Sequence, residues 1–186
     1  FQVANLLAIQ VVEHLYRPLL HLSKGPIEVS PVALNDGERD FVRDLSEYHA
    51  SHPEFFNGRE LYLLRNMSKG RGIGFFEAGN FYPDFIVWLV DQDTQRIAFV
   101  DPKGIRNLEG PQDPKIRFHQ TIKELQAHLN DPQVILSSFI IANTRYQEVG
   151  WWNGGMTKPE LEEHHVLFQL DDRSTYIGKL LDRILA

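Results

Sequence analysis

Two short stretches decide the fold and the chemistry of this chain: Phe-Tyr-Pro-Asp-Phe-Ile-Val-Trp-Leu at residues 81–89 and Ile-Ala-Phe-Val-Asp-Pro-Lys-Gly at residues 97–104. Each contains an apolar run of strand length, and the polar residues 91–94 between them are typical of a hairpin turn. Asp84 precedes the first run, and Asp101 follows the second. A hairpin between the two runs would bring these aspartates together at one end of a sheet.

Lys103 lies two residues after Asp101, and residues i and i+2 of an extended chain point to the same face. Two carboxylates at one point repel each other unless a cation joins them, and oxygen ligands of this kind suit Mg²⁺ or Mn²⁺. A neighbouring lysine can hold a water molecule and stabilise charge on a phosphate. The combination predicts a site for metal-assisted phosphodiester hydrolysis, although each residue alone is explained as well by a strand end or a turn.

The sequence around these stretches predicts a mixed α/β domain. Apolar residues recur at helical spacing in residues 3–16, 41–48 and 118–129, and a closing helix is expected at 176–185. Strand-like runs occupy residues 61–64, 73–76, 85–90, 97–100, 134–142 and 165–170. This order predicts a central mixed β-sheet with helices on both sides. We expect residues 1–186 to form one domain, with residues 1–30 as a helical extension and connector.

The composition excludes several classes of protein. A chain of 186 residues with 42% hydrophobic and 24% charged residues can fill a core, so it is neither disordered, collagen-like nor a coiled coil. The absence of cysteine excludes disulfides, thiolate zinc sites and cysteine nucleophiles, and it fits a cytoplasmic location. No apolar run reaches the roughly 18 residues of a membrane span, so no membrane partner is expected. Because the chain starts at Phe1 without a signal peptide, we expect a fragment of a larger protein.

The net charge of −6 argues against a nonspecific polyanionic partner, but basic residues are concentrated on either side of residues 72–101. A local basic patch can hold nucleic acid on an acidic domain. A solvated surface is the alternative explanation for either run of basic residues. The candidates for contact with a nucleic-acid backbone are Lys69, Arg71, Arg106, Lys115 and Arg117.

Pro83-Asp84, a gap of sixteen residues and Asp101-Pro102-Lys103 resemble the PD-(D/E)xK motif. Restriction endonucleases and Holliday-junction resolvases share that motif and its fold. The flanking residues, Gly-Phe-Phe-Glu-Ala-Gly-Asn-Phe-Tyr-Pro-Asp-Phe at 74–85, are similar to one branch of the superfamily. This branch is the nuclease domain at the C-terminus of type III restriction subunits and related superfamily 2 helicases. The resemblance extends over about residues 36–142.

The resemblance implies a restriction-endonuclease-like fold, Mg²⁺ or Mn²⁺ as the cofactor and DNA as the substrate. It implies Asp84 and Asp101 as metal ligands and Lys103 as the catalytic lysine. In many members a helix before the core adds a glutamate to the metal site, and Glu38 matches that position; the helix dipole is an alternative explanation for Glu38. The implied partners are a helicase or translocase region of the parent chain and a methyltransferase or other subunit of a defence system.

The leading hypothesis is therefore a Mg²⁺-dependent DNA endonuclease domain of a restriction or helicase–nuclease defence system. One alternative is a nuclease-like DNA-binding or assembly module in which cleavage is weak or absent. Another is an unrelated metal-dependent hydrolase of small phosphate esters.

Three further features lead to narrower expectations. Pro102 cannot donate to a sheet ladder, so the second strand should end or lie at an edge there. Polar residues that start the helix after the motif, His119 or Gln120, are candidates to support the site, with a surface role as the alternative. His164-His165 does not predict a zinc site, because no third ligand follows at a suitable spacing and adjacent strand residues face opposite ways.

Overall fold

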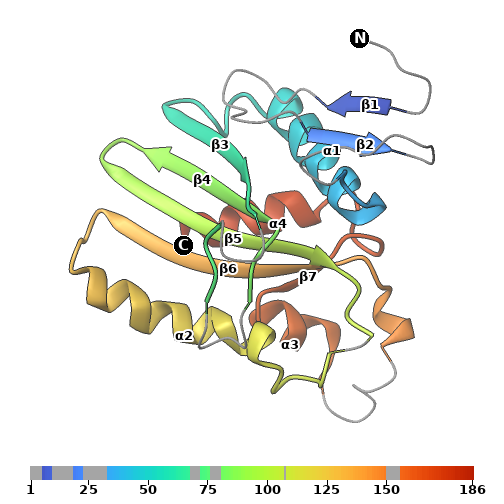
Figure 1. Ribbon diagram of the computed structural model, residues 1–186. Helices are drawn as coiled ribbons and strands as arrows, with labels where there is room; N and C mark the ends of the chain where they lie inside the picture. Colours follow the sequence, from blue (N-terminus) through green and yellow to red (C-terminus); the bar gives the residue numbers. More distant parts are fainter. Residues whose placement is uncertain are drawn as a thin grey trace.

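The computed structural model describes residues 6–9, 19–22, 33–67, 72–75, 81–106, 108–149 and 156–186. Their central element is a five-stranded sheet in the order β3-β4-β5-β6-β7 (Figure 1). Its strands are β3 (Arg59–Arg65), β4 (Phe85–Asp91), β5 (Thr94–Lys103), β6 (Val134–Ala142) and β7 (Val166–Phe168). Strand β4 is antiparallel to both β3 and β5, whereas β5, β6 and β7 run parallel to one another. The predicted α/β fold with a mixed open sheet is confirmed at this level.

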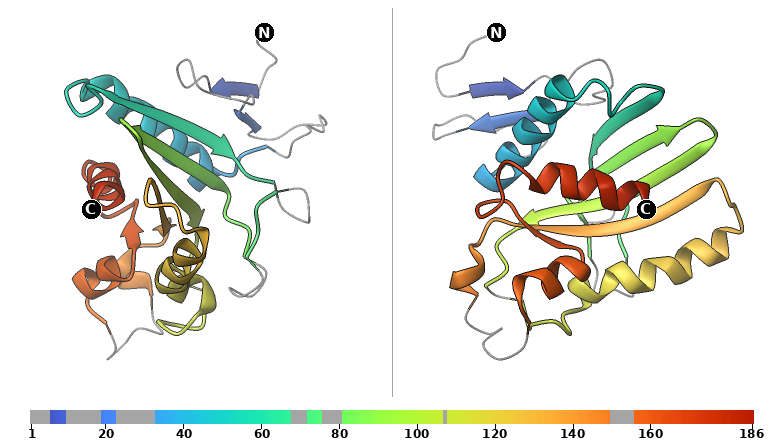
Figure 2. Two further views of the ribbon diagram at one scale, coloured as in Figure 1. Left: turned by 90° about the vertical axis from the view of Figure 1, so that its left-hand side faces the viewer. Right: turned by 180° about the vertical axis from the view of Figure 1, so that it is seen from behind.

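Helices cover both faces of the sheet (Figures 1 and 2). One face packs against α1 (Asp36–Ser51) and α4 (Tyr176–Leu185), and the other against α2 (Pro114–Leu129), which lies mainly over β6. A short helix, α3 (Lys158–Glu163), precedes β7, and a 3₁₀ turn spans Tyr146–Glu148. Strand β4 shows why two layers form: Val87 is buried toward α1 and α4, and its neighbour Ile86 toward α2, because successive strand residues point to opposite faces.

The β4–β5 hairpin is the part of the fold that positions the two motif stretches. Asp91 pairs with Thr94, and Gln92, in the two-residue turn between them, has the left-handed φ of 55° that such a turn favours. At the other end of the hairpin Phe85 pairs with Val100. If this register continues by one residue, Asp84 lies opposite Asp101.

Pro102 lies where β5 has only one neighbouring strand. It pairs with Ile141 of β6, whereas the pairing with β4 ends at Val100. The absent N–H of Pro102 therefore interrupts no ladder with β4. The prediction that the strand lies at an edge at this point is confirmed, and β5 ends one residue later at Lys103.

The prediction of a helix over residues 3–16 is wrong for the described part of that range. Residues Leu6–Ile9 form strand β1, which pairs antiparallel with β2 (Leu19–Leu22). Each strand is a short apolar run, Leu-Leu-Ala-Ile or Leu-Leu-His-Leu, and such a run suits a strand as well as a helix. The run at residues 73–76 is also not a strand in its described residues, since Phe75 makes only an isolated bridge to Phe81.

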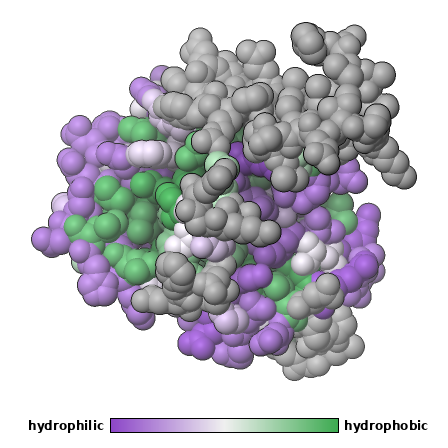
Figure 3. All heavy atoms as spheres, in the orientation of Figure 1, coloured by the Kyte–Doolittle hydropathy of each residue, from purple (hydrophilic) through white to green (hydrophobic). Residues whose placement is uncertain are grey.

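Helix α2 lies mainly over β6, so part of the same face of the sheet, over β3 and β4, is not covered by any described helix. Trp88 of β4 is 37% exposed there and lies opposite Tyr62 of β3. These rings border a groove of about 910 Å³, and apolar side chains gather on this side of the visible surface (Figure 3). None of the described helices is both long enough and apolar enough to cross a bilayer.

Helix α1 provides a test of the core that supports the site. Leu45 is fully buried between α1 and the sheet, whereas Arg43 on the same helix is exposed. We expect Leu45→Ala to lower the free energy of unfolding by about 2–5 kcal/mol, because it leaves a cavity that the core cannot close. Arg43→Ala should change it by less than about 0.5 kcal/mol. Urea denaturation of the two variants measures both values, and equal effects would contradict this packing.

Candidate functional site

Asp84 and Asp101 meet at the end of the β4–β5 hairpin. Residues directly opposite each other in an antiparallel pair point to the same face, with Cβ atoms about 4.5–5.5 Å apart. Asp101 is only 3% exposed, and its side chain is hydrogen-bonded to the carboxyl group of Asp84. The structure thus brings together the two aspartates that the sequence predicted to be neighbours.

Lys103 completes the predicted trio. Its ammonium group forms an ion pair with Oδ2 of Asp101, and its Nζ lies 5.5 Å from the centroid of the Phe81 ring. Its backbone is fixed as well, because the amide of Asn143 at the end of β6 donates to the Lys103 carbonyl at 3.0 Å. The i, i+2 phase of Asp101 and Lys103 therefore places a cation directly beside the paired carboxyl groups.

This arrangement changes the ionisation of Asp84. Burial raises the pKa of its carboxyl group to about 8, and the hydrogen bond to Asp101 and the charges of Asp101 and Glu38 act in the same direction. The Lys103 ammonium opposes them but does not outweigh them. At pH 7 the Asp84–Asp101 pair holds one proton, which takes the place of a cation between the two carboxyl groups.

Glu38 lies near this pair, but its carboxyl group is already engaged. Asn35 caps α1 and forms a capping box with Glu38: the backbone amide of Glu38 donates to Asn35 Oδ1 at 3.0 Å, and the backbone amide of Asn35 donates to Glu38 Oε2 at 3.2 Å. In addition, Asn35 Nδ2 donates to Glu38 Oε1 at 2.7 Å. Arg65 Nη2 lies 3.6 Å from Oε2. Burial raises the pKa of Glu38, the Asn35 hydrogen bond and Arg65 oppose this shift, and Asp101 adds to it. Glu38 is thus coupled electrostatically to the aspartates without being free to turn toward them.

The side chains that could act as ligands determine whether the predicted metal ion fits this site. Within the described ranges, no three His, Cys, Asp or Glu side chains gather in an arrangement that could hold a metal ion. Mg²⁺ is often held by one or two carboxylates, with water and substrate phosphate as the remaining ligands. Asp84 and Asp101 fit that smaller set, and the buried Asp101 Oδ2 has the Lys103 ammonium group as its ion-pair partner.

Asn66 was missed by the sequence reasoning, although it fixes the backbone of the first motif. Its amide donates to the carbonyl of Asp84 at 2.8 Å, and its Nδ2 donates to the carbonyls of Pro83 at 2.8 Å and Ile73 at 2.7 Å. The sequence signal that could have identified Asn66 is its position just after the predicted strand at 61–64, at the sheet end to which the hairpin brings Asp84.

The predicted DNA-contacting residues have different surroundings. Lys69 and Arg71 lie outside the described residues. Arg106 pairs with Glu148, which offsets part of its charge. Arg117 is exposed on the first turn of α2, and Lys115 lines a small pocket beside that turn.

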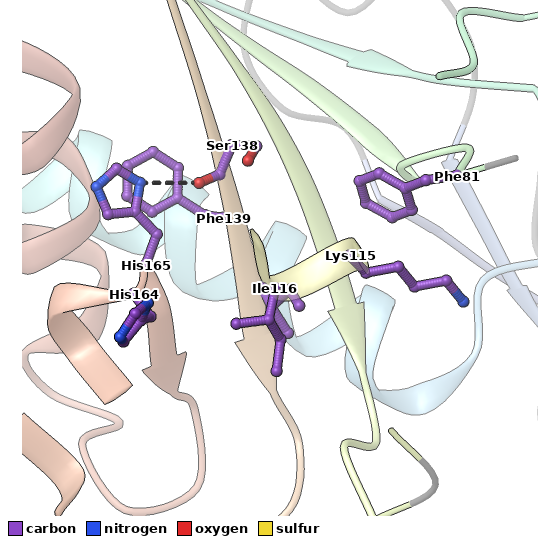
Figure 4. A pocket seen from close by; sticks show the side chains of 8 residues that line it. Phe81, Lys115, Ile116, Ser138, Phe139, His164 and His165 are labelled. Atoms are coloured by element: carbon purple, nitrogen blue, oxygen red, sulfur yellow. Dashed lines mark hydrogen bonds between the residues drawn. The ribbon is translucent and has the colours of Figure 1, made fainter. Parts of the chain in front are cut away.

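The same pocket shows a histidine cluster that sequence spacing could not predict (Figure 4). His164 and His165 precede β7 rather than lying in it, and both line the pocket, so the argument from strand alternation is wrong. His119 of α2 is a third imidazole nearby, with Nε2 3.2 Å from His164 Nδ1. His165 Nδ1–H donates to the Ser138 carbonyl at 2.9 Å, while Lys115 extends away from the histidines.

Two of the three histidines in this cluster are poor phosphate ligands, because burial keeps them uncharged at neutral pH. Burial lowers the pKa of both His119 and His165 to about 4, and neighbouring histidines and basic groups add to the shift. Two of the three rings are therefore neutral at pH 7 and cannot attract a phosphate backbone by charge. Gln120 on α2 is exposed. The predicted supporting role of His119 or Gln120 stays a prediction.

Comparisons of the chain with models of protein families, with curated proteins and with solved structures find no match. The resemblance to the PD-(D/E)xK motif, and with it the restriction-endonuclease-like fold, therefore stays a prediction. Its support comes from the quoted residues and from the geometry of Asp84, Asp101 and Lys103.

The shared proton predicts a pH dependence of stability. Because the pKa of Asp84 is raised to about 8 in the folded chain, the folded protein holds a proton that the unfolded chain loses near pH 4. This contribution to stability is present at low pH and is lost as pH rises toward 8. Between pH 5 and 8, the free energy of unfolding of the wild type should fall relative to that of Asp84→Asn, by at most about 1.4 kcal/mol per pH unit.

Urea denaturation in EDTA across this pH range measures the difference. Asp93→Asn, in the exposed hairpin turn, is the matched control. Its free energy of unfolding should change with pH in the same way as that of the wild type. If the Asp84→Asn curve also runs parallel to the wild type, the two aspartates do not share a proton.

Proposed function

We propose that this chain is a metal-dependent DNA endonuclease domain that hydrolyses phosphodiester bonds. The observation that carries the proposal is the contact between the carboxyl groups of Asp84 and Asp101 at a sheet end, with a lysine ion-paired to Asp101. A carboxyl pair that retains a proton at neutral pH is a ready binding site for a divalent cation, because the cation can replace the proton.

Each residue of the trio has a distinct part in such a reaction. Asp84 and Asp101 would hold Mg²⁺ or Mn²⁺, and Asp84 would release its proton on binding. When bound, the ion would polarise the phosphate and activate a water molecule. Lys103 would orient the attacking water and stabilise the negative charge that develops on the phosphate. Phe81 covers one side of the lysine, which limits the directions in which its ammonium group can point.

The charge balance supports the same roles. The site combines three acidic side chains (Glu38, Asp84 and Asp101) with two basic ones (Arg65 and Lys103). With Asp84 protonated, the two remaining carboxyl groups face two cations. Binding of a divalent ion with release of the proton would leave the site with a positive charge, which is the state that attracts a phosphodiester.

The choice of DNA as substrate rests on the resemblance and on the basic residues at the start of α2. Arg117 and Lys115 form no ion pair with a described residue, so their charges are available for a backbone phosphate. We place the domain in a restriction or helicase–nuclease system of the cytoplasm, beside a translocase region and a methyltransferase or similar subunit.

A plasmid-nicking assay with Mg²⁺ or Mn²⁺ tests the proposal. We expect the wild type to nick supercoiled DNA, and Asp84→Asn, Asp101→Asn and Lys103→Ala each to reduce the rate by at least about 100-fold, the typical cost of removing one transition-state contact. Asp93→Asn, on the exposed turn of the same hairpin, should cleave like the wild type.

Cleavage that is equal in all variants would refute the assignment of the site. A second candidate, a DNA-binding module with weak or absent cleavage, is favoured by the engagement of Glu38 in the capping box and with Arg65. It predicts DNA binding in a gel-shift assay without nicking by any variant. Hydrolysis of a chromogenic phosphate ester without nicking would indicate the small-molecule hydrolase instead.

A further inference from the structure

Three buried side-chain atoms among the described residues have no hydrogen-bond partner, and two of them belong to residues of this site. One is the acceptor Oδ2 of Asp101, and the other is the donor Nη1 of Arg65. A buried charged donor without an acceptor costs more than about 1–3 kcal/mol, so such atoms are rare unless a ligand or water satisfies them. Asp101 Oδ2 still faces the ammonium group of Lys103, whereas no described group accepts from Arg65 Nη1, so the candidate site lacks an acceptor oxygen at Arg65.

Arg65 is fixed in position by the sheet. It is the last residue of β3 and pairs with Phe85, the residue that follows Asp84. The next residue, Asn66, donates through its amide to the carbonyl of Asp84, so the backbone of Arg65 cannot shift without moving the motif. Its side chain is 13% exposed, and its guanidinium lies beside Glu38, whose charge in turn acts on Asp84.

Glu38 does not satisfy Arg65. The closest approach is 3.6 Å between Nη2 and Oε2, which is too long for a hydrogen bond. Both carboxylate oxygens of Glu38 already accept hydrogen bonds from Asn35. The charge of Glu38 therefore holds the guanidinium near the site, while the planar fork of donors remains available to another acceptor.

From these contacts we infer that Arg65 binds a phosphate oxygen and forms an anion subsite next to Asp84. A guanidinium matches the oxygens of a phosphate in geometry and charge, and arginine is preferred where phosphate is recognised by planar donors. The inference rests on the proposed function, because the phosphate would be that of a nucleic-acid strand held beside the metal site. Arg65 would position the strand, while Lys103 acts at the reacting phosphate.

The first experiment measures anion binding rather than cleavage. Melting temperatures are recorded in EDTA with inorganic phosphate, with a short DNA duplex, and with sodium chloride at matched ionic strength. We expect phosphate and duplex to raise the melting temperature of the wild type above the chloride value. In Arg65→Gln the apparent affinity for both should fall about 10- to 100-fold, the loss expected for one charged hydrogen bond.

The matched control is Arg59→Gln, at the opposite end of the same strand. Arg59 is also ion-paired, with Asp91 at 3.1 Å, and donates to the Phe55 carbonyl, but it lies at the far end of β3 from the site. This variant should retain the full response to phosphate and duplex. A response to the duplex alone would assign the subsite to a phosphodiester, and a response to both would assign it to phosphate oxygens in general.

Either of two results would overturn the inference: no specific stabilisation of the wild type by phosphate or duplex, or an equal response in Arg65→Gln. Both would mean that a buried water alone satisfies Nη1. If Arg65→Gln does not fold, the side-chain NMR signal of Arg65 in the wild type decides, because it must move on addition of phosphate. The nicking assay is independent of this result, so loss of the nuclease proposal and loss of the subsite are distinguishable.

Discussion

The register of the β4–β5 hairpin holds Asp84 and Asp101 close together, although their carboxylates repel each other. The two strands are bonded from Asp91–Thr94 at the turn to Phe85–Val100 at the far end, and their inward side chains form the centre of the core. Asn66 holds the backbone of Asp84 from β3, and Asn143 holds that of Lys103 from β6. The hydrophobic core thus forces together two groups that would otherwise move apart, and the raised pKa of Asp84 is the result.

A forced carboxyl pair lowers the stability of a fold at neutral pH, and such strain is characteristic of functional sites. The neighbouring charged groups reduce this loss of stability without removing it. Lys103 pairs with Asp101, Asp84 keeps a proton, and Arg65 faces Glu38. Asp101 Oδ2 has the Lys103 ammonium group beside it, whereas Arg65 Nη1 has no acceptor among the described residues. A phosphate oxygen would satisfy this donor.

The sequence was sufficient for the parts of the molecule that depend on local pattern. The apolar runs of β4 and β5 and the spacing in α2 follow from neighbouring residues, and so does the phase of Asp101 and Lys103. The region of β1 and β2 was assigned incorrectly, because a short apolar run has no reliable period and its pairing depends on a segment ten or more residues away. The histidine cluster was missed for a related reason, since His119 and His164 are 45 residues apart and meet only through packing.

Arg65 and Glu38 show the same limit within the site itself. Arg65 was visible only as one member of a basic run, because its role depends on which residue of β4 lies beside it. The resemblance implied Glu38 as a residue of the metal site, and the structure shows that its charge acts on Asp84. Its engagement by Asn35 and Arg65 depends on side-chain geometry that spacing does not contain.

Crystals soaked in Mn²⁺ and measured at an anomalous wavelength would show whether the aspartate pair binds a divalent cation. We expect a single strong peak in contact with the carboxyl groups of both Asp84 and Asp101, and its loss in Asp84→Asn. No peak at this pair at millimolar Mn²⁺, with the ion pair between Lys103 and Asp101 unchanged, would contradict the proposed metal site.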